Sequence, residues 1–185
     1  MNPLSPAAFK PHILLAMPSL QDGYFDRSVI LLCEYSESGA MGFVINSPSA
    51  TTVDDLLGEL GLTTDPPQPS RIMIGGPVQS ELCWVVHSLD FSGQSTTAIG
   101  EQLALSAAQE VLTAIAEGEV PGLYLLGVGY AGWGPGQLDR EIEQGAWWLA
   151  ELDPCEVMAI PCEERWRRIM ERLGLNTAYA CYCKA

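Results

Sequence analysis

The fold of this chain is decided by one stretch, Gly127-Val-Gly-Tyr-Ala-Gly-Trp-Gly-Pro-Gly136. It holds five glycines, one proline and two aromatic residues, a composition that favours neither a helix nor a regular strand. The apolar run 123–126 precedes it, and the polar run 137–142 follows it. We therefore predict a strand, then a tightly folded loop that carries Tyr130 and Trp133, then a helix. Because such a loop costs backbone entropy, we expect it to shape a site.

Composition and charge restrict the class of protein. Of the 185 residues, 48% are hydrophobic, which fits one globular domain with a substantial core. Nine basic residues against 23 acidic ones give a net charge of −14, and such a charge argues against direct binding to nucleic acid or to anionic membranes. No apolar run approaches the roughly 18 residues that indicate a membrane span, so we expect no membrane association.

The N-terminal residues and the cysteines bear on the compartment. Only Lys10 precedes the short apolar run 13–17, which Pro18 ends, whereas a secretory signal has a basic segment and a longer apolar run. The six cysteines lack the spacing of a secreted scaffold, so we expect reduced thiols and a cytoplasmic protein. Cys181 and Cys183 lack the Cys-x-x-Cys spacing of a zinc knuckle, so no metal site is predicted.

Hydrophobic periodicity predicts a mixture of strands and helices. Apolar runs with β-branched residues predict strands at 12–17, 28–34, 40–46, 71–75, 82–87 and 122–127. Apolar residues at helical spacing predict helices at 52–61, 106–118, 137–144 and 163–173. The segment 36–39 predicts a hairpin between the strands 28–34 and 40–46. Thr52 could cap the helix 52–61, and Ser106 and Gln109 fit a capping box. Residues 1–11 hold three prolines and predict an irregular arm, and residues 90–100 predict a mobile loop. Since strands and helices do not alternate regularly, the fold class is α+β.

The glycine-rich stretch also matches a cofactor motif. Gly127, Gly129 and Gly132 fit the G-x-G-x-x-G pattern of dinucleotide-binding proteins. That fingerprint requires a helix to begin at the glycines, so that its amides face a pyrophosphate. Here the segment 134–136, Gly-Pro-Gly, falls where the first helical turns would lie, and proline breaks a helix interior. We therefore expect a structural loop and no nicotinamide, flavin or other cofactor.

Two further groups of side chains could carry chemistry. His87 ends an apolar strand, where it could act as a general base, although a strand-end histidine bonded to the backbone is the more ordinary interpretation. Cys83 lies on the same side of that strand if the strand is regular. Asp22, Asp26 and Arg27 cluster in the first polar loop, where they could bind a polar ligand or form turn bonds and an ion pair.

One helix carries the basic cluster of the chain. Arg165, Arg168 and Arg172 would share a helical face that could touch a phosphate or an acidic partner. Glutamates at 163, 164 and 171 lie among them, so we favour a self-neutralising, solvated face.

Several long stretches together point to a known family. They are Ala16-Met-Pro-Ser-Leu-Gln-Asp22, Phe25-Asp-Arg-Ser-Val-Ile-Leu-Leu-Cys-Glu34, Gly39-Ala-Met-Gly-Phe-Val-Ile-Asn46, Gly75-Gly-Pro-Val78, His87-Ser88, Gly129-Tyr-Ala-Gly-Trp-Gly-Pro-Gly-Gln-Leu138, Glu141-Ile142, Ala146-Trp147, Asp153-Pro154 and Arg165-Trp166. Through them the chain resembles the AlgH/YqgE family, a widespread bacterial group. Gly23 and Gly145 depart from the family pattern, and the tail 180–185 lacks the usual terminal histidine, so no role of that histidine transfers here.

The resemblance carries expectations about fold and location. It implies a single compact α+β domain over residues 1–185, with a branched or barrel-like, mostly antiparallel sheet surrounded by helices. It also implies a cytoplasmic location and the label of a transcriptional regulator, which the net charge of −14 does not support by itself. The family has no agreed biochemical role, so the resemblance implies no reaction.

Three functions remain open, and we place them in this order. The first is a regulatory or adaptor protein that binds a small ligand or a protein at a site formed by the glycine-rich loop, the loop 22–27 and the turn 75–77. The second is a hydrolase-type acid–base enzyme, which requires His87 to lie exposed beside a carboxylate. The third is a regulator that binds DNA directly, which requires a contiguous positive surface. The candidate ligand-binding residues are Asp22, Asp26, Arg27, Asn46, Gly75, Gly76, His87, Tyr130, Gly132, Trp133, Gln137 and Glu141.

Overall fold

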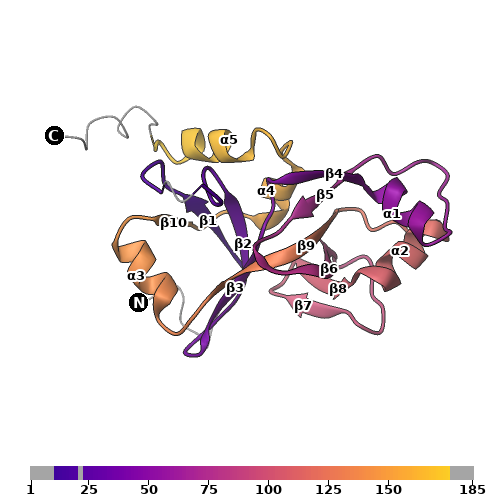
Figure 1. Ribbon diagram of the computed structural model, residues 1–185, viewed down its shortest axis with the longest axis horizontal. Helices are drawn as coiled ribbons and strands as arrows, with labels where there is room; N and C mark the ends of the chain where they lie inside the picture. The colour runs from indigo at the N-terminus through magenta and orange to yellow at the C-terminus, as the bar shows by residue number, and fades with distance from the viewer. Residues whose placement is uncertain (1–10, 21–22, 176–185) are drawn as a thin grey trace.

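The computed structural model describes residues 11–20 and 23–175, in which helices flank one branched sheet (Figure 1). Its strands are β1 (His12–Ala16), β2 (Val29–Ser36), β3 (Gly39–Val44), β4 (Pro48–Thr52), β5 (Arg71–Ile74), β6 (Val78–Ser88), β7 (Thr97–Ile99), β8 (Leu103–Ala107), β9 (Tyr124–Trp133) and β10 (Trp147–Ala150). Its helices are α1 (Val53–Glu59), α2 (Ala108–Ala116), α3 (Gln137–Glu143), α4 (Pro154–Ala159) and α5 (Arg165–Arg172). Residues 1–10 of the predicted arm, Cys181 and Cys183 lie outside the described residues.

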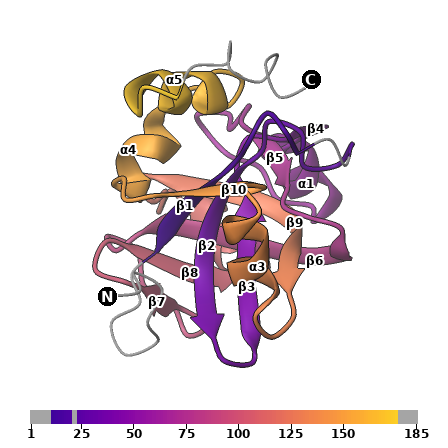
Figure 2. The same cartoon turned by 90° about the vertical axis from the view of Figure 1, so that its left-hand side faces the viewer.

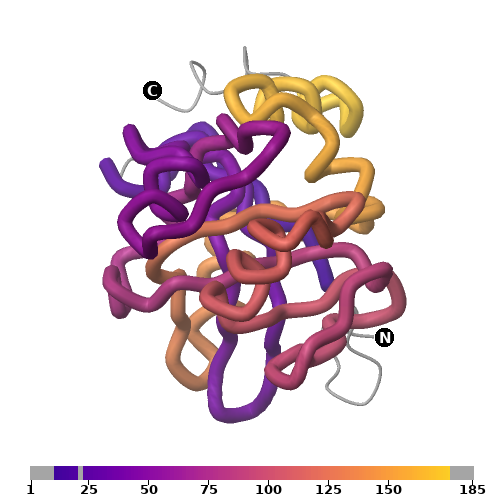
Figure 3. The backbone as a smooth tube through the Cα atoms, turned by 90° about the vertical axis from the view of Figure 1, so that its right-hand side faces the viewer, coloured from indigo at the N-terminus to yellow at the C-terminus, as the bar shows by residue number. Residues whose placement is uncertain are grey.

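Strand β9 is the branch point of the sheet. It pairs antiparallel with β3 near its end and with β6 over most of its length, and it pairs parallel with β5. The main path of the sheet runs β10-β1-β2-β3-β9-β6-β8-β7, while β4 joins only through β5. The sheet curls strongly into a half-barrel, seen from opposite sides in Figures 2 and 3. This confirms the predicted α+β class with a branched, barrel-like, mostly antiparallel sheet.

The helices cover different parts of this sheet. α1 and α2 lie together at one end of the molecule, and α3 lies at the opposite end (Figure 1). None of the helices in the described part of the chain combines the length and apolar character needed to cross a membrane.

The glycine-rich stretch mostly continues β9, so the prediction of a folded loop over 127–136 is wrong for most of its length. The glycines are needed because other groups approach β9 closely. A Cβ atom on Gly127 would lie 2.3 Å from Cζ2 of Trp84, and the Trp84 indole N–H donates to the Gly129 carbonyl at 2.7 Å. Only 134–136 forms the turn that leads into α3.

Gly75 and Gly76 follow β5, and their backbone lies in direct contact with the backbone of β9. A Cβ atom on Gly76 would lie 2.0 Å from the carbonyl carbon of Tyr130. The Gly75 amide donates to the Val128 carbonyl at 2.8 Å, and the Gly75 carbonyl accepts from the Val44 amide at 2.8 Å. This glycine pair therefore joins β3, β5 and β9 at one point.

Helix starts follow the predicted caps in one case and not in another. α1 begins with the predicted Thr52 cap, and the Asp55 carboxylate accepts from the Thr52 amide at 2.8 Å. The capping box predicted at Ser106 is wrong, because α2 begins after Ala107 and no side chain of that residue caps it. Instead, Ser95 Oγ accepts from the Ala107 amide at 3.0 Å, which ties the 90–100 segment to α2.

Arg165 does not lie on a solvated helical face, so that part of the sequence prediction is wrong. Its side chain is 4% exposed, and its Nε donates to the carbonyls of Val157 and Ile160 at 3.1 and 2.9 Å. The guanidinium thus closes the carboxyl end of α4, where a positive charge is favourable. Arg168 does pair with Glu164, at 2.5 Å, as the self-neutralising interpretation predicts.

Because the segment after β5 crosses β9 so closely, we expect one added methyl group at Gly76 to destabilise the protein. We expect Gly76→Ala to lower the free energy of unfolding by about 3 kcal/mol, because the new Cβ would meet the backbone of β9. Gly58→Ala is the matched control, since nothing lies within 4 Å of its added Cβ and alanine gains about 0.5–1 kcal/mol over glycine in a helix. Urea unfolding followed by circular dichroism measures both, and equal stability of the two variants would contradict the prediction.

Candidate functional site

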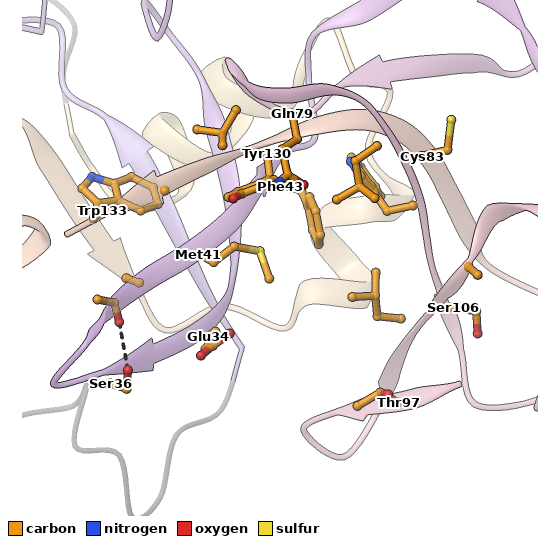
Figure 4. A pocket seen from close by; sticks show the side chains of 18 of the residues that line it. Glu34, Ser36, Met41, Phe43, Gln79, Cys83, Thr97, Ser106, Tyr130 and Trp133 are labelled. Atoms are coloured by element: carbon orange, nitrogen blue, oxygen red, sulfur yellow. Dashed lines mark hydrogen bonds between the residues drawn. The ribbon is translucent and has the colours of Figure 1, made fainter. Parts of the chain in front are cut away.

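A hollow of about 850 Å³ lies between the β2–β3 hairpin, β9, β6 and β8 (Figure 4). It opens where β6 leaves β9, since the pairing of the two strands is interrupted between Val78 and Cys83. Gln79, at the start of this interruption, has a φ of 47°. The larger side chains that line the hollow come from several strands and are Glu34, Met41, Phe43, Leu82, Trp84, Leu105, Tyr130 and Trp133.

The aromatic part of the lining is fixed by its packing. The rings of Phe43 and Trp84 are stacked, with centroids 4.1 Å apart and an interplanar angle of 28°. The Trp84 indole is also hydrogen-bonded to β9, as described above. In Figure 4, Trp133 lies toward one end of the hollow and Cys83 toward the other, with Met41 between them. The hollow is therefore a preformed, largely apolar cavity rather than a gap left by loosely held side chains.

Three of the residues proposed from the sequence line this hollow, namely Tyr130, Gly132 and Trp133. Gly132 is exposed, and a Cβ atom added to it would have only the Tyr130 ring nearby, with the nearer ring atom at 3.4 Å. Trp133 is 7% exposed, so its ring belongs mainly to the core and only a small part of it borders the hollow. The final residues of β9 therefore supply both structural support and lining.

Gln137 and Glu141 do not line the hollow, but they hold Trp133 in place through hydrogen bonds. The Glu141 carboxylate accepts from the indole N–H of Trp133 at 2.9 Å and from that of Trp147 at 2.8 Å. It also accepts from the side-chain Nε2 of Gln137 at 2.8 Å, while the Gln137 side-chain oxygen accepts from the Gly134 backbone amide at 3.0 Å. The two residues thus fix α3 against the end of β9.

The first polar loop lies apart from the hollow. Asn46 follows β3. Its side chain accepts from the Val29 amide at 2.7 Å and donates to the Arg27 carbonyl at 2.9 Å, so it ties the loop and the start of β2 to the end of β3. The Arg27 guanidinium lies 5.7 Å from the centroid of the Trp166 ring. Asp26 is exposed in the same loop, and Asp22 lies outside the described residues. Asp26, Arg27, Asn46, Gly75 and Gly76 do not line the hollow, so the described parts of the three predicted turns do not form one site around it.

His87 is sealed in the interior, with an exposed fraction of 0%. Its Nδ1 lies 2.8 Å from the Ser88 carbonyl oxygen, and its Nε2 lies 2.8 Å from Ser106 Oγ. Ser106 Oγ in turn lies 2.7 Å from Thr96 Oγ1. Both ring nitrogens are therefore occupied, which agrees with the ordinary interpretation of a strand-end histidine. A general base must reach the proton that it removes, so the enzyme hypothesis loses its proposed base.

Most of the lining was missed by sequence reasoning. Phe43, Leu82 and Trp84 were treated only as strand residues, because the interruption of β6 was not predicted. Leu105 was assigned to no element, because β8 was not predicted. The alternation within 40–46 did contain a signal, since it places Met41 and Phe43 on one face of a strand.

The fold and the hollow define a class: a half-barrel α+β domain with an aromatic-lined cavity. The profile of the AlgH-like family matches residues 13–178, so the chain belongs to this family. The predicted resemblance is thereby confirmed.

Relatives and solved structures agree with this assignment. The chain is 42% identical over 179 residues to the UPF0301 protein AlgH of Pseudomonas aeruginosa, with 95% of this chain and 94% of that protein covered. It is 35% identical over 173 residues to a UPF0301 protein of Vibrio atlanticus, with 90% and 92% covered. The solution structure of AlgH from P. aeruginosa matches with a TM-score of 0.74 and 39% identity, over 98% of this chain and 96% of that one. A crystal structure of a Corynebacterium diphtheriae protein matches with a TM-score of 0.71 and 27% identity, over 96% and 93%.

The shared carboxylate of Glu141 predicts a measurable loss of stability. We expect Glu141→Ala to lower the free energy of unfolding by about 3 kcal/mol, because two indole N–H groups lose their acceptor. Glu143→Ala is the matched control, since Glu143 is an exposed residue of the same helix and its loss changes stability by less than about 0.5 kcal/mol. Urea unfolding followed by tryptophan fluorescence compares the two. A Glu141→Ala variant as stable as the control would show that the carboxylate does not support the two rings.

Proposed function

We propose that this protein is a regulatory or adaptor module that binds a small, largely apolar ligand in the hollow between the β2–β3 hairpin, β9, β6 and β8. The observation that carries the proposal is the lining itself: fixed aromatic and aliphatic side chains from separate strands face one cavity of about 850 Å³. Small-molecule sites have this character, with volumes of roughly 300–1,000 Å³ and few polar groups. Tyr130, Gly132 and Trp133 connect the hollow to the stretch that the sequence singled out.

The described geometry favours binding over catalysis. His87 is enclosed and its ring nitrogens are occupied by backbone and hydroxyl oxygens. The Cys83 thiol borders the hollow, but burial raises its pKa, so it lacks the thiolate character that a nucleophile needs. Ser106 borders the hollow and its hydroxyl lies 2.8 Å from His87 Nε2. Ser106 is only 3% exposed and its hydroxyl also lies 2.7 Å from Thr96 Oγ1, so this pair is held in the interior and does not face the hollow as a free nucleophile and base.

Direct DNA binding receives little support from the basic residues. On α5, Arg167 pairs with Glu171 at 2.8 Å, Arg168 with Glu164 at 2.5 Å, and Arg172 with Glu156 at 2.8 Å. These arginines are neutralised locally in a chain whose net charge is −14. A regulatory role would then act through a ligand or a protein rather than through phosphate contacts.

A cytoplasmic location belongs to the same proposal. Cys33, Cys83, Cys155 and Cys162 are all free thiols in the described part of the chain. Reduced cysteines are the usual state in the cytoplasm.

A cavity-filling variant tests the binding proposal. We expect the neutral dye N-phenyl-1-naphthylamine to fluoresce more strongly with the wild-type protein, and Gly132→Leu to weaken its binding by at least about tenfold, because the leucine side chain would occupy the hollow. We expect Gly132→Leu to fold, since Gly132 is exposed and an added Cβ atom has only the Tyr130 ring within 4 Å.

The matched control is Gly58→Leu, which adds the same side chain to an open position of α1. Circular dichroism and thermal unfolding confirm that both variants are folded. Equal dye binding by wild type and Gly132→Leu, or no dye binding by any of the three proteins, would overturn the proposal.

A further inference from the structure

We propose that the ligand of the hollow is an organic cation, an amine or quaternary ammonium group attached to an apolar body. This inference rests on the proposed function and specifies the chemistry of the same site. It rests on three features of the lining: one carboxylate, four aromatic rings, and no arginine among the described residues.

Glu34 is the only charged side chain among the described residues that line the hollow. It is exposed on β2, beside the point where the pairing of β2 with β3 shifts register. No salt bridge within the described part of the chain uses its carboxylate. A carboxylate beside an apolar cavity, without a basic neighbour in the lining, is available to a cation that enters from solvent.

The aromatic rings of the lining add a second preference for positive charge. Phe43, Trp84, Tyr130 and Trp133 all border the cavity. The faces of such rings carry negative potential and attract alkylammonium groups. Tyr130 is the half-buried ring of the four, whereas Phe43, Trp84 and Trp133 are buried and border the cavity with only part of their surface. The stacked pair of Phe43 and Trp84 is held in place by the backbone bond of Trp84, so these rings need little reorganisation to receive a ligand.

The polar groups of the lining are compatible with an ammonium group. Ser36 and Ser38 lie on the hairpin, with their hydroxyl oxygens 2.7 Å apart. Thr97 of β7 also lines the hollow, well apart from Ser36 (Figure 4). Hydroxyl and amide oxygens accept hydrogen bonds from an ammonium group as readily as they serve a neutral ligand. They therefore add specificity without reversing the charge preference that Glu34 sets.

An anionic ligand is disfavoured because none of the described arginines lines the hollow. Arg71 and Arg165 border a separate hollow, Arg27 lies over Trp166, Arg140 lies on α3, and Arg167, Arg168 and Arg172 pair with glutamates. The net charge of −14 adds a long-range attraction for cations and a repulsion for anions. Among the described residues that line the hollow, a carboxylate or phosphate ligand would find no basic side chain to pair with its charge.

Three probes that share one apolar body test this inference: 4-phenylbutylamine, 4-phenylbutan-1-ol and 4-phenylbutanoate, which are a cation, a neutral molecule and an anion near neutral pH. Dissociation constants are measured by ¹H–¹⁵N NMR titration of the full chain. We expect the amine to bind about fivefold more tightly than the alcohol, and the carboxylate more weakly than both. Raising the salt to about 0.5 M should reduce the advantage of the amine and leave the alcohol unchanged.

Glu34→Gln removes the charge and keeps the size of the side chain. We expect it to weaken amine binding about fivefold and to leave alcohol binding unchanged. Glu37→Gln is the matched control, because Glu37 is exposed on the same hairpin and does not line the hollow. It should leave the affinity for all three probes unchanged.

The possible results separate this inference from the proposed function. If the alcohol binds as tightly as the amine, or if Glu34→Gln and Glu37→Gln behave alike, the charge preference is overturned while the hollow remains a binding site. If the amine binds but Gly132→Leu does not weaken it, the cation binds the acidic surface rather than the hollow, and the inference is also overturned. If neither the probes nor the neutral dye perturb residues of the hollow, the proposed function falls with it.

Discussion

The architecture depends on the close approach of other backbone and ring atoms to β9, which only glycine permits. The carbonyl of Gly129 accepts a hydrogen bond from the Trp84 indole N–H, and Gly76 lies directly against the backbone at Tyr130. One strand can therefore pair with β3, β5 and β6 within ten residues. A Cβ atom at these positions would separate the strands by more than hydrogen bonds can span. The glycines that resemble a cofactor loop are instead the condition for a branched sheet.

The candidate site follows from the same constraint. β6 pairs with β9 at Val78 and again from Cys83 to His87, but not between Val78 and Cys83. The hollow lies beside this unpaired segment. Because the Phe43–Trp84 stack is fixed at the point where the strands still pair, the aromatic lining belongs to the rigid core. Binding sites supported by regular strands are better preorganised than sites on loops. This is the physical reason why we take the hollow, rather than the polar loop at Arg27, as the candidate site.

The sequence predicted the local structure better than the site. The β2–β3 hairpin and the Thr52 cap depend on neighbours in the chain, and both are confirmed. The interruption of β6 and the pairing of β5 with β9 depend on contacts between distant segments, which periodicity does not contain. Tyr130 and Trp133 were identified because two aromatic residues among glycines are unusual. Glu34 and Trp84 were not, because each is ordinary in its own strand and becomes significant only because the fold brings both to the lining of one hollow.

The two roles of β9 are divided by the alternation of its side chains. Ala131 and Trp133 pack into the core cluster near α3, where Glu141 fixes the Trp133 ring. Tyr130 packs on the other core cluster, the one that contains Phe43 and Trp84, and Gly132 is exposed beside it. A shift of one residue in the pairing of β9 with β3 would exchange these two sets. The site and the α3 core are therefore specified by one register, and a ligand that binds only this register stabilises the whole sheet through mass action.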